Sequence, residues 1–362
     1  MERDQRRFTN QKSQNGEEVT MSTILVYSDK YMGHHHGGEH PERPARLKAI
    51  VGGLRKTKLW TSPNVRVIAP IPAKREDIQL AHDPNYVKLV EKLSSLEKPI
   101  DGDTPVQKNT FELALLAAGG TMEAGRMVMA GWADNAFALV RPPGHHAHRD
   151  HGGGFCYFNN LAIMVEQLKR DFNLKRIFVL DFDAHHGNGT QDIFYDDPTV
   201  LFMSIHQHPF TLYPGTGFPE DTGREEGEGY KVNVPMKPGS GDLEYLSVMR
   251  EIFIPLCDKF KPQLFAVSAG FDAHLNDPLT GLQLSTEAYG WLAGMAIEQA
   301  MQRCNGKIIF ALEGGYDLDG VSGGVVNVVK AMLGEKFNPP SRTKQVDIVD
   351  EVKSILHDKW KL

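Results

Sequence analysis

Residues 176–189 read RIFVLDFDAHHGNG, and this stretch decides the fold class. The run 176–180 is apolar after its first residue, which is typical of a short strand buried on both faces of a parallel sheet. The nine residues that follow carry aspartates, histidines and glycines. In open α/β sheets such loops at the carboxyl ends of the strands line the active-site crevice. We therefore expect a sheet with a polar site at this edge.

Similar patterns recur along the chain. Five further β-type runs lie at 23–27, 136–140, 200–204, 264–268 and 307–312, and segments of helical length lie at 110–130, 161–170, 242–260, 286–304, 320–333 and 347–360. This alternation predicts an α/β fold with one domain, a central, mostly parallel sheet and flanking helices. All these runs except 23–27 lead into loops rich in His, Asp, Gly or Tyr. We expect those loops to converge.

Composition limits the classes of function. The chain has 362 residues, 41% hydrophobic, with 40 Lys+Arg against 46 Asp+Glu. The formal charge of −6 gives no basic footprint, so direct nucleic-acid binding is not expected. No apolar run of about 18 residues occurs, so no membrane span is expected. Residues 1–20 are polar and predict a disordered leader, with one catalytic domain over 21–362.

The three cysteines are Cys156, Cys257 and Cys304, and none forms a CxxC pair. This spacing favours neither a disulfide framework nor a zinc ribbon. It suits a reducing compartment, so we expect a cytoplasmic protein, with nuclear residence left open. The oligomeric state is also left open, a homo-oligomer included.

A metal site is the first chemical hypothesis. If strand geometry persists, Asp181, Asp183 and His185 point to one face, and Asp272 follows another strand. Asp183, His185 and Asp272 would make three ligands of mixed oxygen and nitrogen character, as a catalytic zinc requires. Other divalent metals accept the same donors. The alternatives are a solvated turn at 181–187 and a helix N-cap at Asp272.

Two further groups suit hydrolytic chemistry. His145 and His146 follow RPPG and titrate near neutral pH, so they suit acid–base work, although paired surface histidines are the simpler alternative. Tyr316 follows Glu-Gly-Gly and could donate to an oxyanion, although a packing role is the default. The tract 34–40, HHHGGEH, is interpreted as a polar rim loop. The acidic loop 220–228 either attracts a cationic substrate or is a solvated turn.

Taken together, the motifs resemble the zinc-dependent histone deacetylase superfamily, which includes acetylpolyamine amidohydrolases. They occur in order across most of the chain: HPERPAR (40–46), RPPGHH (141–146), GFCYFNN (154–160), DFDAHHGNG (181–189), YPGTG (213–217), SAGFD (268–272) and GGY (314–316). The forms HHGNGTQ and LEGGY resemble the class II branch and its bacterial relatives. The resemblance implies an arginase/deacetylase-like fold.

The resemblance also implies roles. The implied zinc ligands are Asp183, His185 and Asp272, and the implied catalytic pair is His145 and His146, with His146 as base and then acid. Further implied catalytic residues are Asp181, which orients His145, Tyr316, which polarises the acyl carbonyl, and Asn188. Because Asn188 stands where other branches carry Asp, a carboxylate relay behind His146 is left open.

Substrate contacts and a second ion are implied in the same way. Gly154, Phe155 and Tyr213 match the acyl-lysine tunnel, and Asp103 resembles an aspartate at its rim. A structural potassium ion would be held partly by Asp181, Asp183 and His185 with Ser204.

The expected reaction is zinc-dependent hydrolysis of acetylated lysine side chains in proteins or peptides, histones included. The alternatives are a small-molecule amidohydrolase, such as an acetylpolyamine deacetylase, and a longer-chain lysine deacylase. A non-catalytic acyl-binding module would have lost a ligand or a member of the histidine pair, and the sequence has lost none.

Overall fold

The computed structural model describes residues 21–35 and 39–362. The predicted leader, residues 1–20, and His36 of the histidine tract lie outside the described residues. The strands are β1 (Thr23–Val26), β2 (Val65–Ile68), β3 (Asn135–Ala138), β4 (Ile177–Asp181), β5 (Val200–Gln207), β6 (Lys231–Met236), β7 (Leu264–Ala269) and β8 (Ile308–Leu312). They form one sheet in the order β2-β1-β3-β8-β7-β4-β5-β6. Every pairing is parallel, so the predicted single-domain α/β fold is confirmed.

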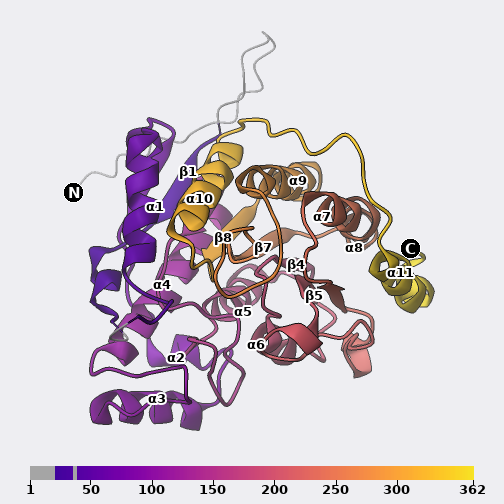
Figure 1. Cartoon of the computed structure of the whole chain (residues 1–362). Helices are drawn as coiled ribbons and strands as arrows, with labels where there is room; N and C mark the ends of the chain where they lie inside the picture. The colour runs from indigo at the N-terminus through magenta and orange to yellow at the C-terminus, as the bar shows by residue number, and fades with distance from the viewer. Residues whose placement is uncertain (1–20, 36–38) are drawn as a thin grey trace.

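Helices cover both faces of the sheet. They are α1 (Ala45–Lys56), α2 (Arg75–Ile78), α3 (Pro84–Leu96), α4 (Thr110–Met129), α5 (Asn160–Phe172), α6 (Asn188–Ile193), α7 (Asp242–Val248), α8 (Ile254–Phe260), α9 (Thr286–Cys304), α10 (Leu318–Met332) and α11 (Asp347–Trp360). In Figure 1, α1, α10 and α9 lie side by side along one face, and α4 and α5 lie along the other. The strands between them are almost wholly buried, which explains their continuous apolar runs.

All six predicted strands are present, but β2 and β6 were not expected. The run of β6, KVNVPM, contains Pro235, which lacks an N–H and argues against a central strand. The sheet tolerates it because β6 is an edge strand. Its other unusual residue, Lys231, is buried and donates to the carbonyl oxygens of Asp197 and Val200, at 3.2 and 3.0 Å.

The helix expected over residues 242–260 is present, but its hydrogen-bonding pattern changes in the middle. A π-helical turn, η5 (Met249–Phe253), separates α7 from α8. Pro255 in the first turn of α8 has no N–H to donate, and its ring would clash with the carbonyl group four residues earlier, so the regular ladder is interrupted. Short 3₁₀ turns complete the fold at η1 (Asp29–Gly33), η2 (Leu59–Thr61), η3 (Pro209–Thr211) and η4 (Glu225–Gly227).

The strand order brings the chemically rich loops together. The loops after β3, β4, β7 and β8 carry the histidine pair, the Asp/His cluster, Asp272 and Tyr316, and these four strands are adjacent at the centre of the sheet. Because all strands run the same way, the four loops meet at one edge. No helix in the described part of the chain is both long and apolar enough to cross a bilayer.

Candidate active site

Three buried side chains form a compact donor cluster at this edge. Single ligand atoms of Asp183, His185 and Asp272 all lie within 4.8 Å of one another. The two carboxylates are fully buried and His185 is 8% exposed, so the alternative of a solvated turn at 181–187 is wrong. The N-cap alternative for Asp272 is also wrong. The next helix begins at Thr286, and Asp272 instead accepts a hydrogen bond from the backbone N–H of Ala184 at 2.7 Å.

The cluster has the charge and the space that a cation needs. Burial alone would lower the pKa of His185, but Asp272 and Asp183 outweigh it and raise the pKa to about 10. The site therefore has a strongly negative potential. Gly314 leaves room beside it, since a Cβ atom there would lie 2.6 Å from Asp183 Oδ2. Two carboxylates, one imidazole and this space fit a divalent metal ion.

His145 is supported by carboxylates. Its Nδ1 lies 3.0 Å from Asp181 Oδ2, and its Nε2 lies 3.8 Å from Asp183 Oδ1. Burial would lower the pKa of His145, but Asp183 and Asp181 raise it to about 10. The geometry therefore favours a protonated, positively charged ring at this position.

His146 has a different partner. Its Nδ1 lies 2.8 Å from Oδ1 of Asn188, the first residue of α6. Burial, followed by the neighbouring rings of His145 and His185, lowers the pKa of His146 well below its ordinary value. A neutral ring whose Nδ1–H is given to an amide oxygen keeps Nε2 free to accept a proton.

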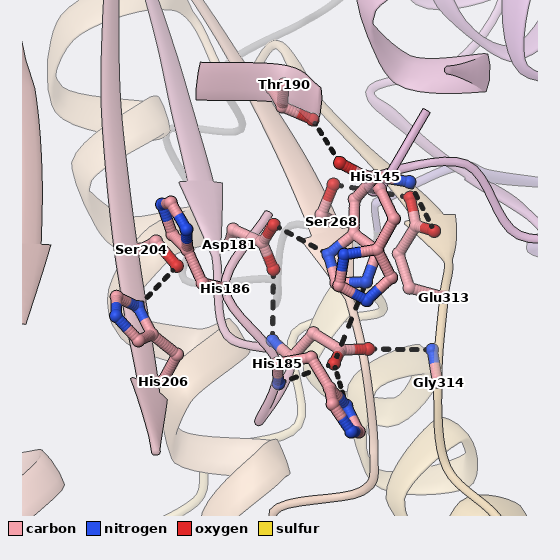
Figure 2. Close-up of polar contacts among 12 residues, drawn as sticks. His145, Asp181, His185, His186, Thr190, Ser204, His206, Ser268, Glu313 and Gly314 are labelled. Carbon is pink, nitrogen blue, oxygen red and sulfur yellow. Dashed lines mark hydrogen bonds and ion pairs between the residues drawn. The ribbon is translucent and has the colours of Figure 1, made fainter. Parts of the chain in front are cut away.

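The sequence reasoning missed Glu313, the residue after β8. Figure 2 shows His145 between Asp181 and Glu313. One carboxylate oxygen of Glu313 accepts hydrogen bonds from the backbone N–H groups of Gly144 and His145, at 2.7 and 3.2 Å. Glu313 is fully buried, and this burial raises its pKa to about 7. It anchors the backbone of the histidine pair, and the only sequence signal for it was its place before Gly-Gly-Tyr.

Aromatic rings enclose the approach to His146. The ring of Tyr213 meets that of His146 edge-to-face at 5.1 Å, and Phe155 meets Tyr316 at 5.9 Å. Gly154 has φ +53°, and a Cβ atom there would lie 2.5 Å from the His146 ring and 2.9 Å from Tyr213. The close approach of this loop therefore requires glycine. Tyr213 is 45% exposed, which places it toward the rim.

Tyr316 is held by residues from two other segments of the chain. Its ring lies under the Arg46 guanidinium at 5.0 Å, and its backbone N–H donates to Asp277 Oδ2 at 2.7 Å. Arg46 also donates to the carbonyl oxygens of Gly315 and Glu313, at 2.6 and 2.5 Å. Asp277 was not singled out from the sequence, because an aspartate followed by proline reads only as a turn.

The rim carries carboxylates and part of the histidine tract. Asp103 is exposed, and its carbonyl oxygen lies 3.3 Å from His40 Nε2. The adjacent Thr104 hydroxyl accepts the N–H of Phe155 at 3.1 Å, and the exposed Asp101 lies beside Gly153.

The histidine tract does not lie wholly at the rim. His35 is exposed, and the ring of His40 packs on Phe155 at 4.7 Å. The rim prediction is wrong for His34, which is fully buried, with its carbonyl oxygen accepting from Arg141 at 3.0 Å. The buried pair of Arg141 and Glu42 needs such carbonyl partners for its remaining donors.

A parallel α/β sheet with a buried Asp/His donor cluster, two histidines and a tyrosine at its carboxyl edge is an arrangement that suits hydrolytic chemistry. A family model described as "Histone deacetylase domain" matches residues 40–332 of the chain. The chain belongs to the histone deacetylase family, whose members are deacetylases and related amidohydrolases.

Individual relatives agree with this placement. A probable deacetylase of Archaeoglobus fulgidus is 45% identical over 300 residues, covering 83% of each chain. The mouse polyamine deacetylase HDAC10 is 35% identical over 334 residues, covering 88% of this chain and 49% of the relative. The crystal structure of the HDA15 HD domain matches with a TM-score of 0.87 at 33% identity, covering 95% of this chain and 96% of that chain.

Proposed function

We propose that the protein is a zinc-dependent hydrolase of acetylated lysine side chains in proteins or peptides, histones included. The observation that carries this proposal is that three groups of side chains lie together at one edge of the sheet. These are the donor cluster Asp183, His185 and Asp272, the pair His145 and His146, and Tyr316. An amide is a poor electrophile with a poor leaving group, so its hydrolysis needs both carbonyl activation and proton transfer.

Asp183, His185 and Asp272 would hold the zinc ion. When bound, zinc supplies a Lewis acid for the acyl oxygen and lowers the pKa of water toward neutrality. The backbone N–H groups of Ala184 and Gly314 donate to Asp272 and Asp183, at 2.7 and 2.8 Å. These hydrogen bonds orient the carboxylates before an ion arrives.

The histidine pair divides the proton work. His146, neutral and with Nε2 free, takes the proton of the attacking water and then delivers it to the departing amine. His145, whose Nδ1 is held by Asp181, would stabilise the negative charge that develops on the substrate. Tyr316 would donate a hydrogen bond from its hydroxyl group to the acyl oxygen as that oxygen gains charge.

Phe155, Tyr213 and Gly154 would form the walls that hold the aliphatic part of the substrate, and Asp103 would contact its backbone at the rim. The exposed carboxylates of Asp101 and Asp103 also suit a cationic small molecule, so an acetylpolyamine is the second candidate substrate. The loop 220–228 gives this alternative less support. Its Arg224 pairs with Asp196, and its Glu228 accepts from Thr222.

We further propose a structural potassium ion next to the zinc site. Asp181 and Ser204 face each other in the register of β4 and β5, and both are fully buried. Their oxygen atoms suit a hard monovalent cation. Three buried, unpaired cysteines support a reducing compartment such as the cytoplasm.

The proposal is tested by metal analysis and a substrate panel. Purified protein should contain about one zinc per chain, lose activity on chelation and recover it with zinc. Acetyl-lysine peptides, longer acyl-lysine peptides and N-acetylpolyamines should be compared by kcat/KM, with acetyl-lysine peptides expected to be best. Full activity without bound metal would overturn the zinc mechanism. A clear preference for N-acetylpolyamines would replace the substrate class.

A further inference from the structure

Behind Asn188 lies a second histidine–aspartate pair. The side-chain nitrogen Nδ2 of Asn188 lies 3.0 Å from His148 Nε2, and His148 Nδ1 lies 3.2 Å from Asp192 Oδ2. The side chains of His148 and Asp192 are 18% and 51% exposed. A row of hydrogen-bonding groups therefore runs from His146 through Asn188 and His148 to a surface carboxylate.

The geometry of α6 builds this row. Asn188 and Asp192 are four residues apart on a helix, so their side chains lie on the same face. His146 and His148 lie on the loop opposite. One turn of α6 thus presents an amide to the first histidine and a carboxylate to the second.

The atoms that face each other along the row define an arrangement of protons. Asp192 can only accept, and its hydrogen bond with His148 lowers its pKa, so it remains a carboxylate. Because the Asn188 Nδ2 donor lies 3.0 Å from His148 Nε2, this nitrogen accepts and the proton of His148 lies on Nδ1, facing Asp192. The NH₂ group of Asn188 points at the lone pair of Nε2, which turns its oxygen toward His146. His146 then has its proton on Nδ1 and an open Nε2.

We propose that His148 and Asp192 are positioning residues that orient the Asn188 amide and thereby fix the reactive tautomer of His146. An amide, unlike a carboxylate, has a donor end and an acceptor end, so Asn188 alone would allow the wrong tautomer of His146. This inference rests on the proposed function, in which His146 Nε2 accepts the proton.

Alanine variants give the first test, with zinc-loaded protein. His148→Ala should lower kcat about tenfold with little change in KM, in line with losses of outer partners of site histidines. Asp192→Ala should lower kcat about two- to fivefold, because its pair is partly exposed. The matched controls are His151→Ala and Asp150→Ala. That exposed pair lies on the same loop, and the His151 ring stacks on His148 at 4.1 Å. Both controls should leave kcat unchanged.

A double-mutant cycle separates orientation from general damage to the loop. In Asn188→Asp both side-chain oxygens accept, so the tautomer of His146 no longer depends on His148. The loss caused by His148→Ala should therefore disappear in the Asn188→Asp background. An equal loss in both backgrounds would overturn the positioning role.

The tautomer itself is observable without turnover. In ¹⁵N-histidine NMR of the zinc-loaded protein, assigned with His146→Ala, we expect His146 to be protonated on Nδ1. In His148→Ala both tautomers should appear, with the melting temperature unchanged. If His148→Ala keeps the wild-type kcat while His146→Ala is inactive, the positioning role is wrong and the proposed function stands. An active His146→Ala would overturn the proposed function.

Discussion

His145 and His146 are neighbours in the chain with ring centroids 4.0 Å apart, yet they stand in opposite surroundings. On the side of His145, the carboxylates of Asp181, Asp183 and Glu313 raise its pKa to about 10 against the effect of burial. On the side of His146, burial and two neighbouring rings lower its pKa, and its nearest polar partner is the neutral amide of Asn188.

The difference teaches that two rings of the same residue type can have their pKa values moved in opposite directions by the groups behind them. A ring backed by carboxylates keeps its proton and acts as a positive charge. A ring backed by an amide loses its proton and acts as a base. Pairs of titratable groups whose environments separate their pKa values are the arrangement expected of a general base beside an electrostatic catalyst.

The strongest test of this comparison removes each ring in turn. His146→Ala should lower kcat by about 10²–10⁴, because proton transfer is lost, while the zinc content stays the same. His145→Ala should cost less, because only charge stabilisation is lost. Single-turnover rates and metal analysis of both variants check this. A larger loss in His145→Ala would reverse the assignment.

The next test asks whether stabilisation of the acyl oxygen is separate from the histidine pair. Tyr316→Phe deletes only the hydroxyl and should lower kcat by about 10²–10³, with KM little changed. Tyr316→Ala serves as the packing control, since it also removes contacts with Phe155 and Arg46. If Tyr316→Phe is silent while Tyr316→Ala lowers the melting temperature, the tyrosine only packs.

Asn188→Asp would place a carboxylate behind His146, as Asp181 already stands behind His145. A carboxylate 2.8 Å from His146 Nδ1 should raise the pKa of that ring by about 1 unit or more. The base must be unprotonated, so a higher pKa means that activity is lost earlier as the pH falls. The acid limb of the kcat/KM profile should therefore move to higher pH. If the acid limb of the profile stays at the same pH, the loss of activity at low pH is not caused by protonation of His146.

Glu313→Gln should have the smallest effect on turnover and a clear effect on stability. The pKa of Glu313 is raised from 4.5 to about 7, so folding favours its protonated form. Its contribution to stability is full below about pH 4.5 and is lost as the pH rises through 7, by at most about 3 kcal/mol.

Glutamine stays neutral and keeps an acceptor, so the variant should gain stability relative to the wild type between pH 5 and pH 7.5. Urea unfolding at both values measures this change. A difference between the two proteins that does not vary with pH would contradict the raised pKa.

Much of this molecule could be predicted from local patterns. Apolar runs predicted six of the strands, and the five runs that lead into loops rich in His, Asp, Gly or Tyr predicted the edge at which the site lies. The placement of Asp183, His185 and Asp272 follows from two such strand ends and the rule for parallel sheets. Strand β6 and the π-helical turn before α8 were not predicted, because Pro235 and Pro255 are tolerated only through their positions at a sheet edge and in the first turn of α8.

The sequence by itself determined the fold class, the family resemblance and the residues at the strand ends, because each depends on patterns within a few residues. Only the tertiary structure decided what stands behind those residues. Glu313 reaches the backbone of His145 across 168 positions, Asp277 reaches Tyr316 across 39, and Asn188 meets His148 across 40. No periodicity records such contacts. They arise because parallel strands from distant parts of the chain end at one edge, where buried polar groups must find partners.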